Sequence, residues 1–220
     1  MVQGAILGIS SIIVRIIGVI YRIPLTNIIG EKGIGYYSVA FDIYQILLLL
    51  SCYSLPLAVS KMVSARVALG QYRRVRKIFI NALIFAELVG FAAFLITYFF
   101  AADVMKVPQS AYALKVLAFA LVILSVLGVL RGYFQGLGNM VPTAVSNIAE
   151  QILNALVSVV AAASLFRFAA DAGSAKYDFS NAPEALGAAG GTMGTLAGAF
   201  LAMILLIIWV NVYNKKLRYN

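Results

Sequence analysis

Long apolar runs separated by short polar segments are the dominant pattern of this 220-residue chain. Six runs are long enough to cross a bilayer as a helix, which takes about 20 residues for a hydrocarbon core of roughly 30 Å. They cover residues 4–29, 37–65, 78–101, 111–135, 142–168 and 189–213. The pattern predicts an all-α fold, a polytopic transmembrane bundle of six helices that forms a single domain over residues 1–220.

The composition agrees with an integral membrane protein. Apolar residues make up 63% of the chain and charged residues 11%, and the mean hydropathy is +0.96. A typical soluble domain is about half apolar and about a quarter charged.

The formal net charge of +9 comes mainly from short segments between or after the apolar runs. Basic residues follow the second run and the sixth run: Arg66, Arg73, Arg74, Arg76, Lys77, Lys215, Lys216 and Arg218. Six alternating spans place both segments and the N-terminus on one side. The positive-inside rule then predicts a membrane protein with both termini cytoplasmic. Anionic lipid headgroups are sufficient partners for these charges, so we infer no nucleic-acid binding.

The first apolar run carries two arginines on a stripe of small residues. The stripe consists of Gly4, Gly8, Ser11, Arg15, Gly18 and Arg22, at helical steps of three or four. An arginine at the centre of a membrane helix costs about 2.5–3.5 kcal/mol on insertion scales. We therefore expect Arg15 and Arg22 to face a wet cavity or partners inside a bundle. The alternative is that they extend to the membrane surfaces, which Arg22 is well placed to do because it lies near one end of the run.

The first run is also expected to bend and then end. Pro24 interrupts the helical hydrogen bonds, and the Gly30-Glu31-Lys32-Gly33-Ile34-Gly35 segment predicts a turn.

Three other runs contain polar positions that share a helix face. These are Asp42, Gln45, Arg131, Gln135, Asn147, Glu150 and Asn154. Polar stripes on several helices predict an aqueous cavity, and the arginine fork suits a ligand with phosphate. Asp42 and Glu150 are expected to hold the arginines in place before a substrate arrives. For Glu150 the alternatives are pairing with an arginine of another helix, uptake of a proton, or solvation near the cytoplasmic end; for Arg131 the alternative is extension to that surface.

Small residues recur every fourth position in two runs. Gly128, Gly132 and Gly136 lie in the fourth run, and Gly190, Gly194, Gly198 and Ala202 lie in the sixth. This spacing lets helix backbones approach closely, so we interpret both stripes as packing seams.

The chain offers no catalytic constellation. It has no histidine, and the Gly30-Glu31-Lys32-Gly33 segment does not match a phosphate-binding P-loop. We therefore predict no catalytic residues, no metal ligands and no cofactor, and expect that the protein is not an enzyme.

Four segments resemble a known family of exporters. They are Arg15-Ile-Ile-Gly-Val-Ile-Tyr-Arg22-Ile-Pro-Leu, Ile29-Gly-Glu-Lys-Gly-Ile-Gly-Tyr-Tyr, Ser54-Leu-Pro-Leu-Ala-Val-Ser-Lys61, and Arg131-Gly-Tyr-Phe-Gln-Gly-Leu-Gly-Asn-Met-Val-Pro-Thr-Ala-Val-Ser. The chain is similar over its whole length to the polysaccharide-biosynthesis, stage V sporulation protein B-like branch of the MOP exporter superfamily. That branch includes relatives of the MurJ-type lipid II flippases. The segment of residues 131–146 is the most specific part of the resemblance.

The resemblance implies one six-helix lobe of a MOP/MATE-like transporter of the bacterial cell membrane, which works by alternating access around a cation-lined cavity. The substrate implied is a lipid-linked oligosaccharide with a diphosphate, such as the peptidoglycan precursor lipid II or another polysaccharide intermediate, in cell-wall synthesis or sporulation. The family's cavity arginine of the first span corresponds to Arg22 or its neighbour.

Two features depart from the family. Its members have about twice this number of spans, so we expect a second six-helix lobe, from a C-terminal half or another chain. MurJ-type proteins also carry an arginine partway along the second span, where this chain reads Ile46-Leu-Leu-Leu-Leu-Ser51 and Asp42 is the nearest charge.

Other functions stay open at this stage. One is a multidrug or cation antiporter of the same superfamily, which Asp42, Glu87 and Glu150 favour and Arg15 and Arg22 oppose. A second is a membrane enzyme of cell-envelope synthesis, which the lack of histidine and of any acid cluster opposes. The third is a fragment that transports nothing without its partner lobe.

Overall fold

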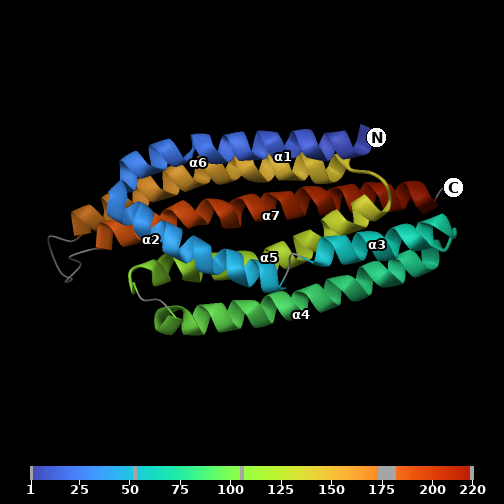
Figure 1. Ribbon diagram of the computed structural model, residues 1–220, viewed down its shortest axis with the longest axis horizontal. Coiled ribbons are helices and arrows are strands. Elements are labelled where there is room, and N and C mark those ends of the chain that lie inside the picture. Colours follow the sequence, from blue (N-terminus) through green and yellow to red (C-terminus); the bar gives the residue numbers. More distant parts are fainter. Residues whose placement is uncertain (1, 52–53, 105–106, 173–181, 219–220) are drawn as a thin grey trace.

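The computed structural model describes residues 2–51, 54–104, 107–172 and 182–218, and in these ranges it is helical apart from short turns. The helices are α1 (Val2–Ile20), α2 (Arg22–Ser51), α3 (Leu55–Ala68), α4 (Tyr72–Val104), α5 (Ser110–Gly136), α6 (Val141–Ala172) and α7 (Ala182–Arg218). They form one elongated bundle with roughly parallel and antiparallel helix axes (Figure 1).

The predicted all-helical fold with six potential membrane spans is confirmed. Six segments of the described chain are long and apolar enough to cross a membrane: Gln3–Ile20, Arg22–Ala68, Tyr72–Ala101, Ser110–Gly136, Val141–Asp171 and Pro183–Tyr213. The helices extend past most of the predicted bounds, because backbone hydrogen bonding continues into flanking residues too polar to register as an apolar run.

The chain reverses direction between the first two predicted spans at Gly30. Its φ of 69° and ψ of 178° interrupt α2, and this backbone region is essentially restricted to glycine. A weaker break separates α1 from α2 at Tyr21. Pro24 has no N–H to donate to the carbonyl of Ile20, where α1 ends, so the predicted proline effect explains this break.

The second predicted span corresponds to two helices of the described chain, on either side of residues 52–53. α2 ends at Ser51 and α3 begins at Leu55. Pro56 lies in the first turn of α3, where a missing N–H removes no helical hydrogen bond.

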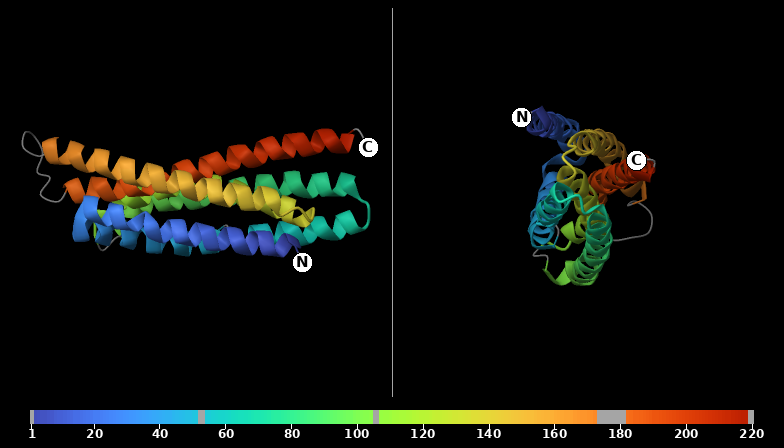
Figure 2. Two further views of the ribbon diagram at one scale, coloured as in Figure 1. Left: turned by 90° about the horizontal axis from the view of Figure 1, so that it is seen from above. Right: turned by 90° about the vertical axis from the view of Figure 1, so that its right-hand side faces the viewer.

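α5 and α7 occupy the inside of the bundle. α7 packs on α6, α5 and α2, and α5 packs on α3 and α4. α1 lies along α6 at the periphery, and α2 lies on the same side of the bundle as α1 in both views of Figure 2. α4 and α7 make no contact with each other in the described chain, although both pack on α5.

Both predicted glycine stripes are confirmed as seams. A Cβ at Gly194 would lie 2.1 Å from Ser158 Oγ, and a Cβ at Gly198 would lie 2.5 Å from the Glu150 carbonyl oxygen, so α7 touches the α6 backbone. A Cβ at Gly132 would lie 2.5 Å from the carbonyl oxygen of Pro56 in α3. Without a hydrophobic force between helices in lipid, such close packing is a main source of association.

One end of the bundle collects the start of α1, the end of α7, the α3–α4 turn and the α5–α6 turn (Figure 1). The other end holds the reversal at Gly30 and the beginnings of α5 and α7. The basic residues that follow the second and sixth apolar runs therefore belong to a single end, as the alternation of six spans requires.

Candidate functional site

The two arginines of α1 lie on a face that no helix of the described chain covers. Arg15 and Arg22 are exposed, whereas Ser10 is buried and Gly18 contacts Gln151 of α6, with 3.3 Å between a Cβ at Gly18 and Nε2 of Gln151. Neither arginine has a carboxylate partner in the described part of the chain. In a membrane, two unpaired guanidinium groups on this face require water, a partner helix or an anionic ligand.

α2 presents a second polar face on the same side of the bundle. Asp42 and Gln45 are exposed. Tyr37 and Tyr44 of the same helix are buried in the core, and the Tyr37 hydroxyl lies 3.1 Å from the Tyr21 hydroxyl. This contact fixes the rotation of α2, so its polar residues point away from the core.

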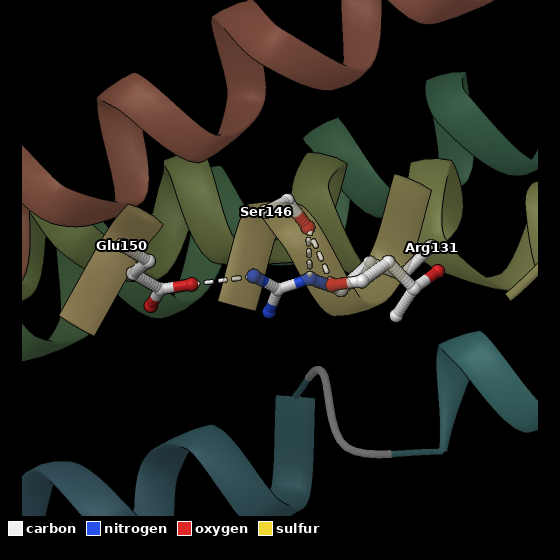
Figure 3. A network of polar contacts seen from close by, with 4 residues as sticks. Arg131, Ser146 and Glu150 are labelled. Atoms are coloured by element: carbon white, nitrogen blue, oxygen red, sulfur yellow. Dashed lines mark hydrogen bonds and ion pairs between the residues drawn. The ribbon is translucent and has the colours of Figure 1, made fainter. Parts of the chain in front are cut away.

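Arg131 and Glu150 form an ion pair between α5 and α6. Arg131 Nη2 lies 2.5 Å from Glu150 Oε2, and the two side chains are 18% and 20% exposed. Arg131 Nε also approaches Ser146 Oγ at 3.5 Å, and that hydroxyl donates to the Thr143 carbonyl at 2.9 Å. Figure 3 shows the arginine with its guanidinium group between Ser146 and Glu150. Of the sequence alternatives for Glu150, the structure favours pairing with an arginine of another helix.

The ion pair changes what Arg131 can do. Its charge is matched by Glu150, and its side chain is mostly covered. A phosphate would have to displace Glu150 to bind Arg131, whereas Arg15 and Arg22 are open to a ligand from the start.

The remaining predicted residues separate into two groups. Asn147 and Gln135 are half-buried on α6 and α5. Asn154 is buried in the α6–α7 seam, where its Oδ1 accepts a hydrogen bond from Ser158, which also lies within donating distance of the Gly191 carbonyl. The stripe predicted on the fifth run therefore divides: Asn154 lies inside the α6–α7 seam, and Glu150 pairs with α5.

Sequence analysis missed one member of the polar network. Ser146 lies one helical turn before Glu150, and this spacing is the signal that identifies it as a neighbour of the same arginine. In the described residues no group of three or more potential metal ligands comes together.

Comparisons with known proteins place this geometry in context. The family model described as "Polysaccharide biosynthesis protein" matches residues 2–217. Stage V sporulation protein B of Bacillus subtilis (strain 168) is 30% identical over 156 residues, which are 69% of this chain and 30% of that protein. Lipid II flippase MurJ of the same organism is 28% identical over 223 aligned residues, 96% of this chain and 38% of MurJ.

A third relative has a name that states no activity. The uncharacterized membrane protein YabM of Bacillus subtilis (strain 168) is 30% identical over 208 residues, covering 93% of this chain and 36% of YabM. The chain thus spans about a third of the length of the curated relatives that it matches. No solved structure matches it.

Proposed function

Because the chain belongs to the polysaccharide biosynthesis protein family, we propose that this multi-pass membrane protein forms one lobe of a transporter for a lipid-linked saccharide. The substrate class is a polyprenyl diphosphate that carries a sugar, such as a peptidoglycan precursor. The names of the MurJ and sporulation relatives support this substrate class.

The observation that carries the proposal is the pair of exposed arginines on the α1–α2 side, which no helix of the described chain covers. Arg15 and Arg22 are exposed and unpaired there, and guanidinium groups bind phosphate oxygens through two parallel hydrogen bonds. Asp42 and Gln45 on the neighbouring helix would orient the arginines or contact the sugar.

In this proposal, the substrate is transported by alternating access. A second six-helix lobe would face the α1–α2 side and enclose the arginines in a wet cavity. Rocking of the two lobes would then open this cavity to each side of the membrane in turn, while the lipid tail stays in the bilayer. In this proposal the basic end of the bundle is cytoplasmic and contacts anionic headgroups.

The proposal predicts that both arginines are required for transport. Arg15→Ala and Arg22→Ala, made in the full-length protein, should each abolish growth of a bacterium depleted of its own lipid II flippase, at unchanged protein level in the membrane. Arg15→Lys should restore growth only in part, because lysine keeps the charge and loses the two-pronged geometry.

Arg167→Ala is the matched control, since Arg167 is an exposed arginine near the C-terminal end of α6. It should support normal growth. Full growth with both α1 variants would disprove the assignment of the site, and energised efflux of a cationic dye would instead indicate the antiporter.

A further inference from the structure

A groove opens between α4 and α7. These two helices lie across the bundle from α1 and α2, as the right-hand view of Figure 2 shows. It exists because both helices pack on α5 without touching each other. The hollow measures about 770 Å³, and its walls come from α4, α5, α6 and α7. Pockets that bury small ligands are typically about 300–1,000 Å³, whereas docking of a transmembrane helix on a seam needs no such volume.

Four phenylalanines and one methionine line the groove together with five aliphatic side chains and one carboxylate. The residues that matter here are Phe91, Phe94, Phe119, Phe200, Met193 and Glu87. The rings of Phe94 and Phe119 lie 4.8 Å apart, and Phe91 lies 5.9 Å from Phe94, so three of the four phenylalanines form one cluster. Aromatic faces carry partial negative charge and attract cations.

Glu87 is the one ionisable residue of this lining. It lies halfway along α4 and is exposed, with no hydrogen bond or ion pair in the described chain. Acidic side chains at such a depth are costly and normally pair with a positive group. The groove therefore combines an unmatched carboxylate with a surface of aromatic rings.

The same aromatic cluster already binds a cation within the chain. Lys115 Nζ lies 5.6 Å from the centre of the Tyr98 ring, and Tyr98 packs on Phe119 at 5.7 Å. An ammonium group is thus accommodated at one edge of the cluster, while the part beside Glu87 is open.

We propose that this groove binds a small lipophilic cation, an organic ammonium or phosphonium with aromatic or alkyl substituents. Its charge would face Glu87, and its apolar groups would pack on Phe91, Phe119 and Phe200. The site is independent of the proposed phosphate site, because it opens on the other side of the bundle and uses a charge of the opposite sign.

The test uses the full-length protein in lipid nanodiscs and radiolabelled tetraphenylphosphonium, whose charge is permanent. Equilibrium dialysis should show saturable binding that Glu87→Gln weakens at least tenfold. Glu87→Asp should retain most of the affinity because the charge remains, and Phe119→Leu should weaken binding several-fold because the ring is lost.

Glu31→Gln is the matched control, since Glu31 is an exposed acid next to the reversal at Gly30, and it should leave binding unchanged. Neutral triphenylphosphine should show no dependence on Glu87. Absence of saturable binding, or equal binding by the wild type and Glu87→Gln, would overturn the proposal; equal binding of the neutral probe would show that the groove takes apolar lipid tails.

Discussion

At the scale of single residues, the charged side chains discussed above for the membrane-spanning helices fall into three groups. Arg131 and Glu150 neutralise each other between two helices. Arg15 and Arg22 are left unmatched on one side of the bundle, and Glu87 is left unmatched on the other. Since an unpaired charge in a membrane is unfavourable, the unmatched groups indicate where something else must bind.

The Arg131–Glu150 pair yields a stability prediction. Glu150→Gln removes the negative charge of the pair. The mostly buried guanidinium group of Arg131 is then left without its carboxylate partner. The expected loss in the free energy of unfolding is about 1–3 kcal/mol. Thermal unfolding of the protein in nanodiscs, followed by intrinsic fluorescence, measures it.

A double-mutant cycle provides the control. Arg131→Gln together with Glu150→Gln should lose less stability than the sum of the two single variants, because neither charge is then left alone. Strict additivity would contradict a direct interaction between the two side chains.

At the scale of helices, glycine determines where backbones meet. In the α6–α7 seam, Gly198 lies opposite Glu150. Gly194 lies opposite Asn154 and Ser158. Asn154 and Ser158 bond to each other within this seam, so these two side chains pair without water. Helix pairing in this bundle thus rests on close contact, with side-chain hydrogen bonds added.

Gly194→Ala should destabilise this pairing. The added Cβ would lie 2.1 Å from Ser158 Oγ and 2.3 Å from the Asn154 carbonyl oxygen. The backbone of α6 cannot move aside as a flexible side chain can, so α7 must shift. Overpacking of this kind costs about 1–3 kcal/mol of stability. A lower midpoint of thermal unfolding in nanodiscs tests this.

Gly8→Ala serves as the comparison for the same substitution. Nothing lies within 4 Å of a Cβ at Gly8, which is in the interior of α1. Alanine should stabilise the helix there by roughly 0.5–1 kcal/mol through its lower conformational entropy. If both variants unfold at the same temperature, close packing at Gly194 does not contribute to stability.

At the scale of the whole molecule, the bundle has two different sides and two different ends. The α1–α2 side is uncovered and exposes two arginines, Asp42 and Gln45 among apolar side chains, and the α4–α7 side has the apolar groove. The chain also spans only about a third of its curated relatives. These observations together support a second lobe on the α1–α2 side.

The orientation in the membrane is a prediction at this scale. With Cys52 replaced by serine, Glu31→Cys at the end with the Gly30 reversal should react with an impermeant maleimide in intact cells. Leu69→Cys, at the basic end beside the α3–α4 turn, should react only after the membrane is opened. The reverse labelling pattern would invert the proposed topology.

Periodicity and residue chemistry alone determined the all-helical class, the six potential spans, the glycine seams and the breaks near Pro24 and Gly30. These properties are local, because a bilayer requires about 20 apolar residues per span and because proline and glycine act on their own backbone. The arginines of α1 were recognisable in the same way, since charge within an apolar run is visible without a fold.

Only the tertiary structure decided how the helices face one another. Helical spacing placed Glu150 and Asn154 on one stripe, but the rotation and tilt of α6 turn Glu150 toward Arg131 and place Asn154 inside the α7 seam. The groove beside Glu87 likewise depends on α4 and α7 packing on α5 without meeting. Such relations join residues far apart in the chain through packing angles, which no single segment of the sequence encodes.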